Sequence, residues 1–277
     1  MTRFVGLFGG LLLLLCGSTA AESAAIFCDN GPHDAAAKNA HSLETLAWTP
    51  LGRPETGWET YAPSIVQEVG TGCHAASPAF AAALGSWQAK HNLAATGVLD
   101  PASFALMRQL WEERRPFVAL SHIACPPPPD ESKLAIARAD ESYGGKTIEL
   151  LPGALDAYRK MVAAARAELL AARMDPRLLT IFSGYRSPAY DAARCAHDQN
   201  CQGLVRASCS AHRTGRAMDV FLGAAPGFAP DSSADANRLY LSRTPVYRWL
   251  VYNAWRFGFV NYIFEPWHWE WTGEHSQ

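Results

Sequence analysis

The chain has 277 residues, enough for one large domain or two modest ones. A hydrophobic fraction of 49% and a charged fraction of 18% are typical of a globular protein and exclude a disordered one. The formal net charge is only −2, so the chain has no broad cationic field to attract nucleic acid or anionic lipid, and nucleic acid is not an expected partner.

The first 21 residues have the parts of a secretory signal peptide. Arg3 supplies the positive start, residues 4–15 form a short apolar run, and residues 18–21 offer small side chains for cleavage. The apolar run is too short to span a bilayer comfortably, and we expect no transmembrane segment after cleavage. Leu15, where a small residue is wanted, argues against a lipid anchor on Cys16. We therefore expect an exported protein.

The cysteines fit an oxidising compartment. Cleavage would remove Cys16 from the seven and leave six, an even number that predicts three disulfides. A pair between Cys28 and Cys73 is favoured because both precede a proline-rich segment at 125–130. The alternative is a structural zinc site, which free thiolates would have to form. Its ligands would come from Cys195, His197, Cys201, Cys209 and His212.

An N-terminal helical module is predicted at 62–115, after a loosely structured lead-in at 22–61 that carries few periodic apolar positions. Ser77-Pro78 and Asp100-Pro101 each combine an N-cap with proline at the first helical position. Apolar residues then follow at helical spacing: Phe80, Leu84 and Trp87, then Phe104 and Met107.

This module resembles the small three-helix peptidoglycan-binding unit. The resemblance covers Ala83 to Met107 and includes the loop Thr96-Gly97-Val98-Leu99-Asp100 between two helices. It implies a contact with the bacterial cell wall. The alternative is that Trp87 and Phe104 serve only as a helical core, as such aromatic stripes usually do.

A Pro-rich linker at 116–139, with the run Cys125 to Asp130, separates the module from a second domain at 140–277. In this domain we predict a long amphipathic helix, with apolar positions from Leu155 to Leu169, that stops before Asp175-Pro176, and another helix from Thr244-Pro245 to Gly258. Strands are predicted at 178–182, 218–222, 259–263 and 267–271. This order indicates an α+β fold with a small antiparallel sheet flanked by helices.

Three short motifs of the second domain carry chemistry. They run from Ser183 to Ser187, from Ser210 to Asp219 and from Glu265 to His268. His212, Asp219 and His268 can together hold Zn²⁺ and leave a fourth position open for water. For Asp219 the alternative is a salt bridge with Arg206, Arg213 or Arg216, and a lone His268 would more often be a satisfied core histidine.

The motifs also offer a base and a cation. Glu265 can deprotonate water, provided that Pro266 bends the chain so that Glu265 and His268 point at the same ion. Glu270 is the competing base. Arg186 follows a buried strand in a glycine-containing turn and suits a substrate carboxylate or an oxyanion, although a surface pair with Asp191 is the alternative.

The three motifs are similar to those of the VanY-type D-alanyl-D-alanine carboxypeptidases, zinc metallopeptidases that act on cell-wall peptides. The patterns S-G-Y-R-S, S-x-H-x-x-G-x-x-x-D and E-P-W-H occur in order, and the similarity extends over about 140–272. The resemblance implies that His212, Asp219 and His268 are zinc ligands, Glu265 the base and Arg186 a substrate contact. It adds Ser210, Ser183 and Tyr185 as further substrate contacts.

The function expected from these features is that of an exported zinc D,D-carboxypeptidase, a monomer in the periplasm or at the cell wall. Its partner would be peptidoglycan or a stem-peptide precursor, with one Zn²⁺ per chain. An endopeptidase with the same machinery is the nearest alternative. A non-catalytic wall-binding protein is the alternative from another class, and it has no use for a water-activating base.

Overall fold

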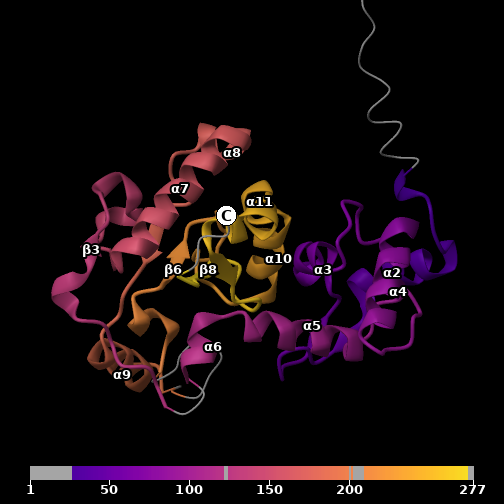
Figure 1. Ribbon diagram of the computed structural model, residues 1–277, viewed down its shortest axis with the longest axis horizontal. Coiled ribbons are helices and arrows are strands. Elements are labelled where there is room, and N and C mark those ends of the chain that lie inside the picture. The colour runs from indigo at the N-terminus through magenta and orange to yellow at the C-terminus, as the bar shows by residue number, and fades with distance from the viewer. Residues whose placement is uncertain (1–26, 122–123, 200, 202–208, 274–277) are drawn as a thin grey trace, which may run out of the picture.

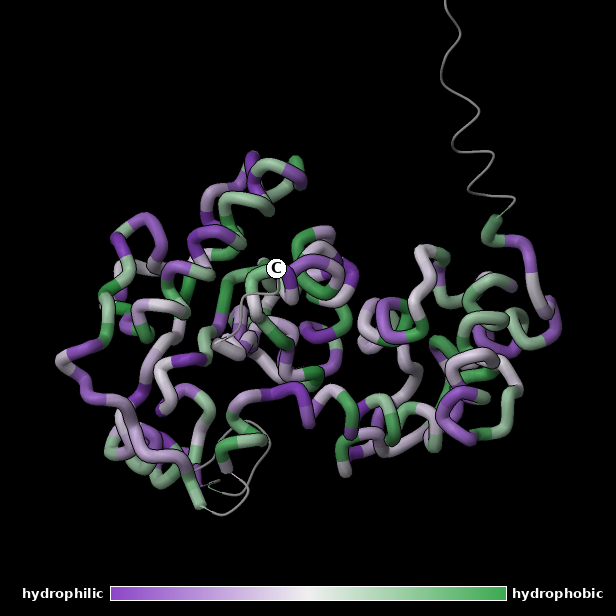
Figure 2. The backbone as a smooth tube through the Cα atoms, viewed as in Figure 1, coloured by the Kyte–Doolittle hydropathy of each residue, from purple (hydrophilic) through white to green (hydrophobic). Residues whose placement is uncertain are grey.

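The computed structural model describes residues 27–121, 124–199, 201 and 209–273, which form two bodies joined by the helices α5 and α6 (Figure 1). The predicted signal peptide and Cys16 lie outside the described residues. Within these ranges no helix has the length and apolar character needed to cross a membrane. Figure 2 shows a hydrophilic stretch between the two bodies, where α5 ends.

The N-terminal body is helical. Its elements are α2 (His33–Thr45), β1 (Ala47–Trp48), β2 (Glu55–Thr56), η1 (Glu59–Tyr61), α3 (Ala62–Glu68), α4 (Pro78–Lys90) and α5 (Pro101–Glu113). The two predicted helix starts are confirmed, because the Ser77 hydroxyl accepts from the amide of Phe80 and the Asp100 carboxylate accepts from that of Ser103.

The prediction of a loose lead-in at 22–61 is wrong for its described part. Trp48, Trp58 and Tyr61 are buried in the same core as Phe80 and Phe104. The sequence did not reveal this because these aromatic residues come from a two-stranded pair and a 3-10 helix, in which apolar positions do not recur at the helical period.

The interval 116–139 is more than a linker. It contains α6 (Pro116–Ser121), which packs against β8, and η2 (Glu131–Lys133). It also contains β3 (Ala135–Ile136), which pairs antiparallel with β4 (Glu149–Leu150) of the following domain. The interval therefore contributes structure to the C-terminal body.

The C-terminal body is built on a four-stranded antiparallel sheet of order β5-β6-β8-β7. Its strands are β5 (Ile181–Ser183), β6 (Ala217–Val220), β7 (Phe259–Asn261) and β8 (His268–Trp271). Its helices are η3 (Ala139–Glu141), η4 (Tyr143–Gly145), α7 (Pro152–Glu168), α8 (Leu170–Met174), α9 (Pro188–His197), η5 (Ala211–Thr214), α10 (Asp235–Arg243), α11 (Pro245–Asn253) and η6 (Ala254–Phe257). The predicted α+β class is confirmed.

Several predicted elements differ in their bounds. The helix predicted to stop before Asp175 is divided into α7 and α8 at Leu169, whose φ of −120° and ψ of 116° are extended. The strands predicted at 218–222, 259–263 and 267–271 are observed at 217–220, 259–261 and 268–271. The strand predicted from residue 178 begins at Ile181, because Leu179 has a φ of 70° and cannot continue an extended chain. The helix predicted to reach Gly258 ends at Asn253 and passes into η6, and Gly258 then ends η6 with a φ of 77°.

One face of the sheet carries the hydrophobic core. Met218 and Val220 of β6 and Trp269 of β8 pack with Tyr158 of α7 and Leu250 of α11. Because side chains alternate along a strand, Asp219, His268 and Glu270 lie on the opposite face. The apolar packing thus directs the polar residues of both strands to one side.

All six described cysteines form disulfides. The favoured pair Cys28–Cys73 is confirmed, and the other two pairs are Cys125–Cys209 and Cys195–Cys201. The alternative of a structural zinc site at these cysteines is therefore wrong, because their sulfurs are bonded to one another. The Cys125–Cys209 bond instead fixes the chain just before Ser210.

Candidate metal centre

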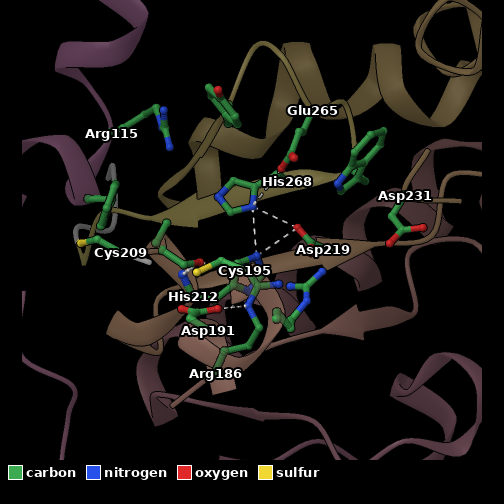
Figure 3. Close-up of a pocket in the computed structure, with 16 residues that line it drawn as sticks. Arg115, Arg186, Asp191, Cys195, Cys209, His212, Asp219, Asp231, Glu265 and His268 are labelled. Carbon is green, nitrogen blue, oxygen red and sulfur yellow. Dashed lines mark hydrogen bonds and ion pairs between the residues drawn. The ribbon is translucent and has the colours of Figure 1, made fainter. Parts of the chain in front are cut away.

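Three buried side chains meet at one point on the polar face of the sheet (Figure 3). Asp219 of β6 and His268 of β8 are direct cross-strand partners, and His212 comes from η5. Oδ1 of Asp219 lies 2.9 Å from Nδ1 of His268 and 3.2 Å from Nε2 of His212. The two imidazole nitrogens lie 3.2 Å apart. The three residues singled out from the sequence are thus brought together.

Local structure places His212 at this point. The hydroxyl of Ser210 accepts from the amide of His212 and begins η5. Gly215 ends η5 with a φ of 68°, a conformation that favours glycine, so that the chain turns directly into β6 and Asp219.

In each imidazole, one ring nitrogen contacts a group outside the three-residue cluster, and the other ring nitrogen faces the two remaining members of the cluster. Nδ1 of His212 donates to the carbonyl oxygen of Gly184 at 2.7 Å, which leaves Nε2 as a lone-pair donor. Nε2 of His268 lies 3.3 Å from Oε1 of Glu270, which leaves Nδ1. Metal-binding histidines in proteins typically have such second partners. The donor set therefore fits a metal ion.

The charges agree with this fit. Burial, together with the nearby cation of Arg186, lowers the pKa of His212 to about 4, so this imidazole is neutral. Burial opposes charge on Asp219 and His268 as well. Even so, the two imidazoles lower the pKa of Asp219, and the carboxylates of Asp219 and Glu270 raise that of His268 to about 9. The position thus attracts positive charge.

Glu265 stands next to this group. Two successive turns bend the chain around it, since its amide donates to the carbonyl of Tyr262 and its carbonyl accepts from the amide of His268. The predicted bend is thus present, and Oε2 of Glu265 lies 3.9 Å from Nδ1 of His268. Burial and the charge of Asp219 raise the pKa of Glu265 to about 7, although His268 opposes the rise. A carboxyl with that pKa can exchange a proton near neutral pH.

In the competing base, Glu270, both carboxylate oxygens already accept hydrogen bonds. Its Oε1 accepts from Nε of Arg115 at 2.8 Å, and its Oε2 accepts from the amide of Phe117 at 3.0 Å. Burial opposes charge here too, but Arg115, with His268 and Phe117, holds the pKa of Glu270 at about 2. A carboxylate held so firmly as an anion is a poor proton acceptor, so the geometry favours Glu265.

Arg186 does pair with Asp191, as the alternative interpretation had it, with Nε 3.0 Å from Oδ1, but the pair is not on the surface. Asp191 is buried, and burial raises its pKa although Arg186 opposes the rise. The Arg186 guanidinium also donates to the hydroxyls of Ser210 at 2.8 Å and Ser183 at 3.3 Å. Asp191 and the serines therefore hold Arg186 in place beside His212.

One cavity of about 270 Å³ is lined by the three candidate metal ligands, by Glu265 and by Arg186. Ser210 lines it too, whereas Ser183 and Tyr185 line an adjoining hollow, where the hydroxyl of Tyr185 donates to Glu131. Sequence reasoning assigned no site role to several other residues of the cavity. Ala211 and Trp267 lie within the motifs, and the others lie outside them: Arg115, Phe117, Asp191, Arg194, Cys195, Cys209, Asp231 and Tyr262.

Comparison with known proteins gives a match over the C-terminal part of the chain. Residues 147–274 match the model of the VanY D-alanyl-D-alanine carboxypeptidase family. Among curated proteins, none matches the chain. One solved structure that matches is a vancomycin-resistance D,D-pentapeptidase VanY variant from a VanB-type resistance cassette, in complex with Zn(II). It has 20% sequence identity and a TM-score of 0.30, and the match covers 53% of this chain and 83% of that one.

Proposed function

We propose that the protein is an exported zinc enzyme that removes the terminal D-alanine from peptidoglycan stem peptides, because residues 147–274 match the VanY D-alanyl-D-alanine carboxypeptidase family model. One observation carries the proposal. His212, Asp219 and His268 offer three ligand atoms within 4.8 Å of one another, in a cavity that also contains the buried carboxyl of Glu265 and the partly buried guanidinium of Arg186.

His212, Asp219 and His268 would hold the zinc ion, through Nε2, a carboxylate oxygen and Nδ1 respectively. Two histidines and a carboxylate are a common ligand set of catalytic zinc, in which a fourth position stays open. When bound, zinc supplies a Lewis acid that polarises the scissile carbonyl and brings the pKa of water to about 7.

Glu265 handles the protons of the reaction. Its carboxylate accepts a proton from the attacking water, and the resulting carboxylic acid donates that proton to the nitrogen of the departing D-alanine. A pKa of about 7 suits both roles, because the group gives up and takes a proton with equal ease near neutral pH. The bend at Pro266 points the carboxyl into the cavity.

Arg186 positions the substrate. Its guanidinium is fixed by Asp191 and Ser210, so it can meet the terminal carboxylate or the developing oxyanion without losing side-chain freedom in each cycle. Ser210 lines the cavity beside it. Ser183 and Tyr185 lie in the adjoining hollow and would contact the more distant part of the stem peptide.

The N-terminal body favours a polymeric or wall-bound substrate over a free dipeptide. Its resemblance to peptidoglycan-binding modules and the signal-peptide pattern at 1–21 agree with a site of action outside the cytoplasm. A catalytically inactive wall-binding protein would gain nothing from the buried Glu265 next to a complete ligand set.

Product analysis tests the proposal. The zinc-loaded protein is incubated with a stem pentapeptide ending in D-Ala-D-Ala and with a cross-linked dimer, and the products are identified by mass spectrometry. We expect the pentapeptide to lose one alanine, a chelator to stop the reaction and added zinc to restore it. Cleavage of the dimer alone would favour the endopeptidase, and no cleavage of either would support a binding protein.

Two variants make the test specific. Asp219→Asn keeps the shape of the side chain but removes the charge of one ligand, so zinc binding and activity should both be lost. Asp156→Asn on the exposed side of α7 makes the same chemical change away from the cavity and should leave both unchanged.

A further inference from the structure

We propose that Arg115 is a positioning residue for the metal site, which orients the ligand His268 through Glu270, so that the N-terminal part of the chain completes the site. The inference rests on the proposed function, because it assumes that His268 binds zinc. It extends the site beyond residues 147–274, since Arg115 lies two residues after the end of α5 of the N-terminal body.

The contacts form a continuous buried chain. Nε and Nη2 of Arg115 lie 2.8 Å and 2.7 Å from Oε1 of Glu270. The amide of Phe117 donates to the other oxygen, Oε2, at 3.0 Å. Both oxygens of Glu270 are therefore held by the three residues 115–117. Oε1 then faces Nε2 of His268 at 3.3 Å.

Arg115 is itself fixed. Its Nη1 donates to Glu112 one helical turn earlier, at 2.6 Å. Its guanidinium lies over the ring of Tyr262, 4.1 Å from the ring centre. In Figure 3, Arg115 lies on the side of the His268 ring away from Asp219. A chain of contacts from Arg115 through Glu270 to His268 thus connects the end of α5 with the candidate metal ligand.

The physical need for Arg115 follows from burial. Only 1% of Glu270 is exposed, and an unpaired carboxylate at such a position is costly. Arg115 supplies the compensating charge. The paired carboxylate of Glu270 can then accept a hydrogen bond from the Nε2–H group of His268, which fixes the ring orientation and leaves Nδ1 to the metal. Without Arg115, the carboxylate of Glu270 would lose the donors that fix Oε1, and the ring of His268 would lose a fixed hydrogen-bond partner.

The experiment compares two adjacent arginines in the full-length protein. Arg115→Met removes the charge at the cavity. Arg114→Met removes a half-exposed arginine that pairs at 2.9 Å with the largely buried carboxylate of Glu68 in the N-terminal body. Arg115→Lys keeps a charge but loses the fork that reaches Glu270 and Glu112 together. Zinc affinity is measured by competition with a chromophoric chelator, and folding by circular dichroism and thermal unfolding.

We expect Arg115→Met to weaken zinc binding by about 10–100-fold, the usual effect of losing an outer partner of a metal ligand. The zinc affinity of Arg115→Lys should lie between those of Arg115→Met and the natural protein. Arg114→Met should bind zinc as tightly as the natural protein. The visible absorption bands of the Co²⁺-loaded protein should shift in both Arg115 variants, because the ligand field changes, and stay constant in Arg114→Met.

Two results separate the possible failures. If the natural protein binds no zinc, the proposed function fails. If it binds zinc tightly, and folded Arg115→Lys and Arg115→Met bind it equally tightly with unchanged Co²⁺ bands, the positioning role is wrong and Arg115 only stabilises the fold. Should Arg115→Met not fold, Arg115→Lys alone decides, since it retains the buried charge.

Discussion

The carbonyl oxygen of Gly184 accepts a hydrogen bond of 2.7 Å from Nδ1 of His212, across 28 positions of sequence. This contact joins the turn after β5 to the 3-10 helix η5 and determines which imidazole nitrogen faces Asp219. The glycine is itself tightly enclosed. A Cβ at position 184 would lie 2.5 Å from the carbonyl oxygen of Glu149 and 2.9 Å from Cγ2 of Ile148.

Gly184→Ala should therefore disturb the metal site without touching a ligand. The new methyl group must push the turn away from Glu149, and the carbonyl that orients His212 moves with it. We expect zinc binding to weaken about 10-fold or more and the free energy of unfolding to fall by about 1–3 kcal/mol. Gly72→Ala is the control, since its Cβ would meet no described atom within 4 Å. Equal zinc affinity in the two variants would contradict the orienting role of Gly184.

Glu265→Gln should separate metal binding from turnover. Glutamine has nearly the same shape as glutamate but cannot accept the proton of water, so kcat should fall by about 10²–10⁴-fold while zinc affinity stays close to that of the natural protein. Glu113→Gln, an exposed position at the end of α5, serves as the control. Kinetics on the pentapeptide and chelator competition give the two readouts. A variant with an undiminished rate would remove Glu265 from the mechanism.

Arg186→Lys should reduce kcat/KM by about 10²-fold, the scale seen when a single donor to a developing oxyanion is lost. Lysine keeps the charge but cannot contact Asp191 and Ser210 at the same time, so the cation is no longer fixed beside His212. Zinc affinity should not change. The control is Arg177→Lys, which alters an exposed pair with Asp175. If both variants keep full activity, Arg186 has only a structural role.

The sequence was most informative where one short segment contains both the alternation of side chains that predicts a strand and a residue of the candidate site. Met218 and Asp219 alternate along one strand, so the core-facing and site-facing positions follow directly from the pattern. Pro266 likewise predicted the bend that turns Glu265 into the cavity. In such cases a local rule determines the local structure.

The pairing of Arg115 with Glu270 could not be predicted in this way. The two residues are 155 positions apart, and Arg115 ends the charged run Glu112-Glu113-Arg114-Arg115, which is typical of a solvated helix end. Only the packing of α6 against β8 brings them together. Trp48 and Trp58 were missed for a related reason, since their burial depends on partners in α4 and α5 rather than on a repeat in their own segment.

A second arginine, Arg238 of α10, connects the two bodies close to Glu265, the proposed catalytic base. Its contacts allow a prediction on stability. It is fully buried and donates to the carboxylate of Glu55 at 3.0 Å, to the hydroxyl of Tyr61 at 2.7 Å and to the carbonyl of Phe264 at 2.9 Å. Phe264 directly precedes Glu265 and lies in the N-terminal core. Arg238 therefore supports the turn that carries the proposed base.

Glu55→Gln should lower the free energy of unfolding by about 3–5 kcal/mol, because it leaves the buried Arg238 cation without its main counter-charge. Glu59→Gln, which alters a more exposed pair with Arg243, should cost less than about 1 kcal/mol. Urea unfolding followed by tryptophan fluorescence measures both. A cost for Glu55→Gln no larger than that for Glu59→Gln would show that the Arg238 cation finds enough compensation from Asp235, 3.3 Å away, and that Glu55 does not stabilise the contact between the two bodies.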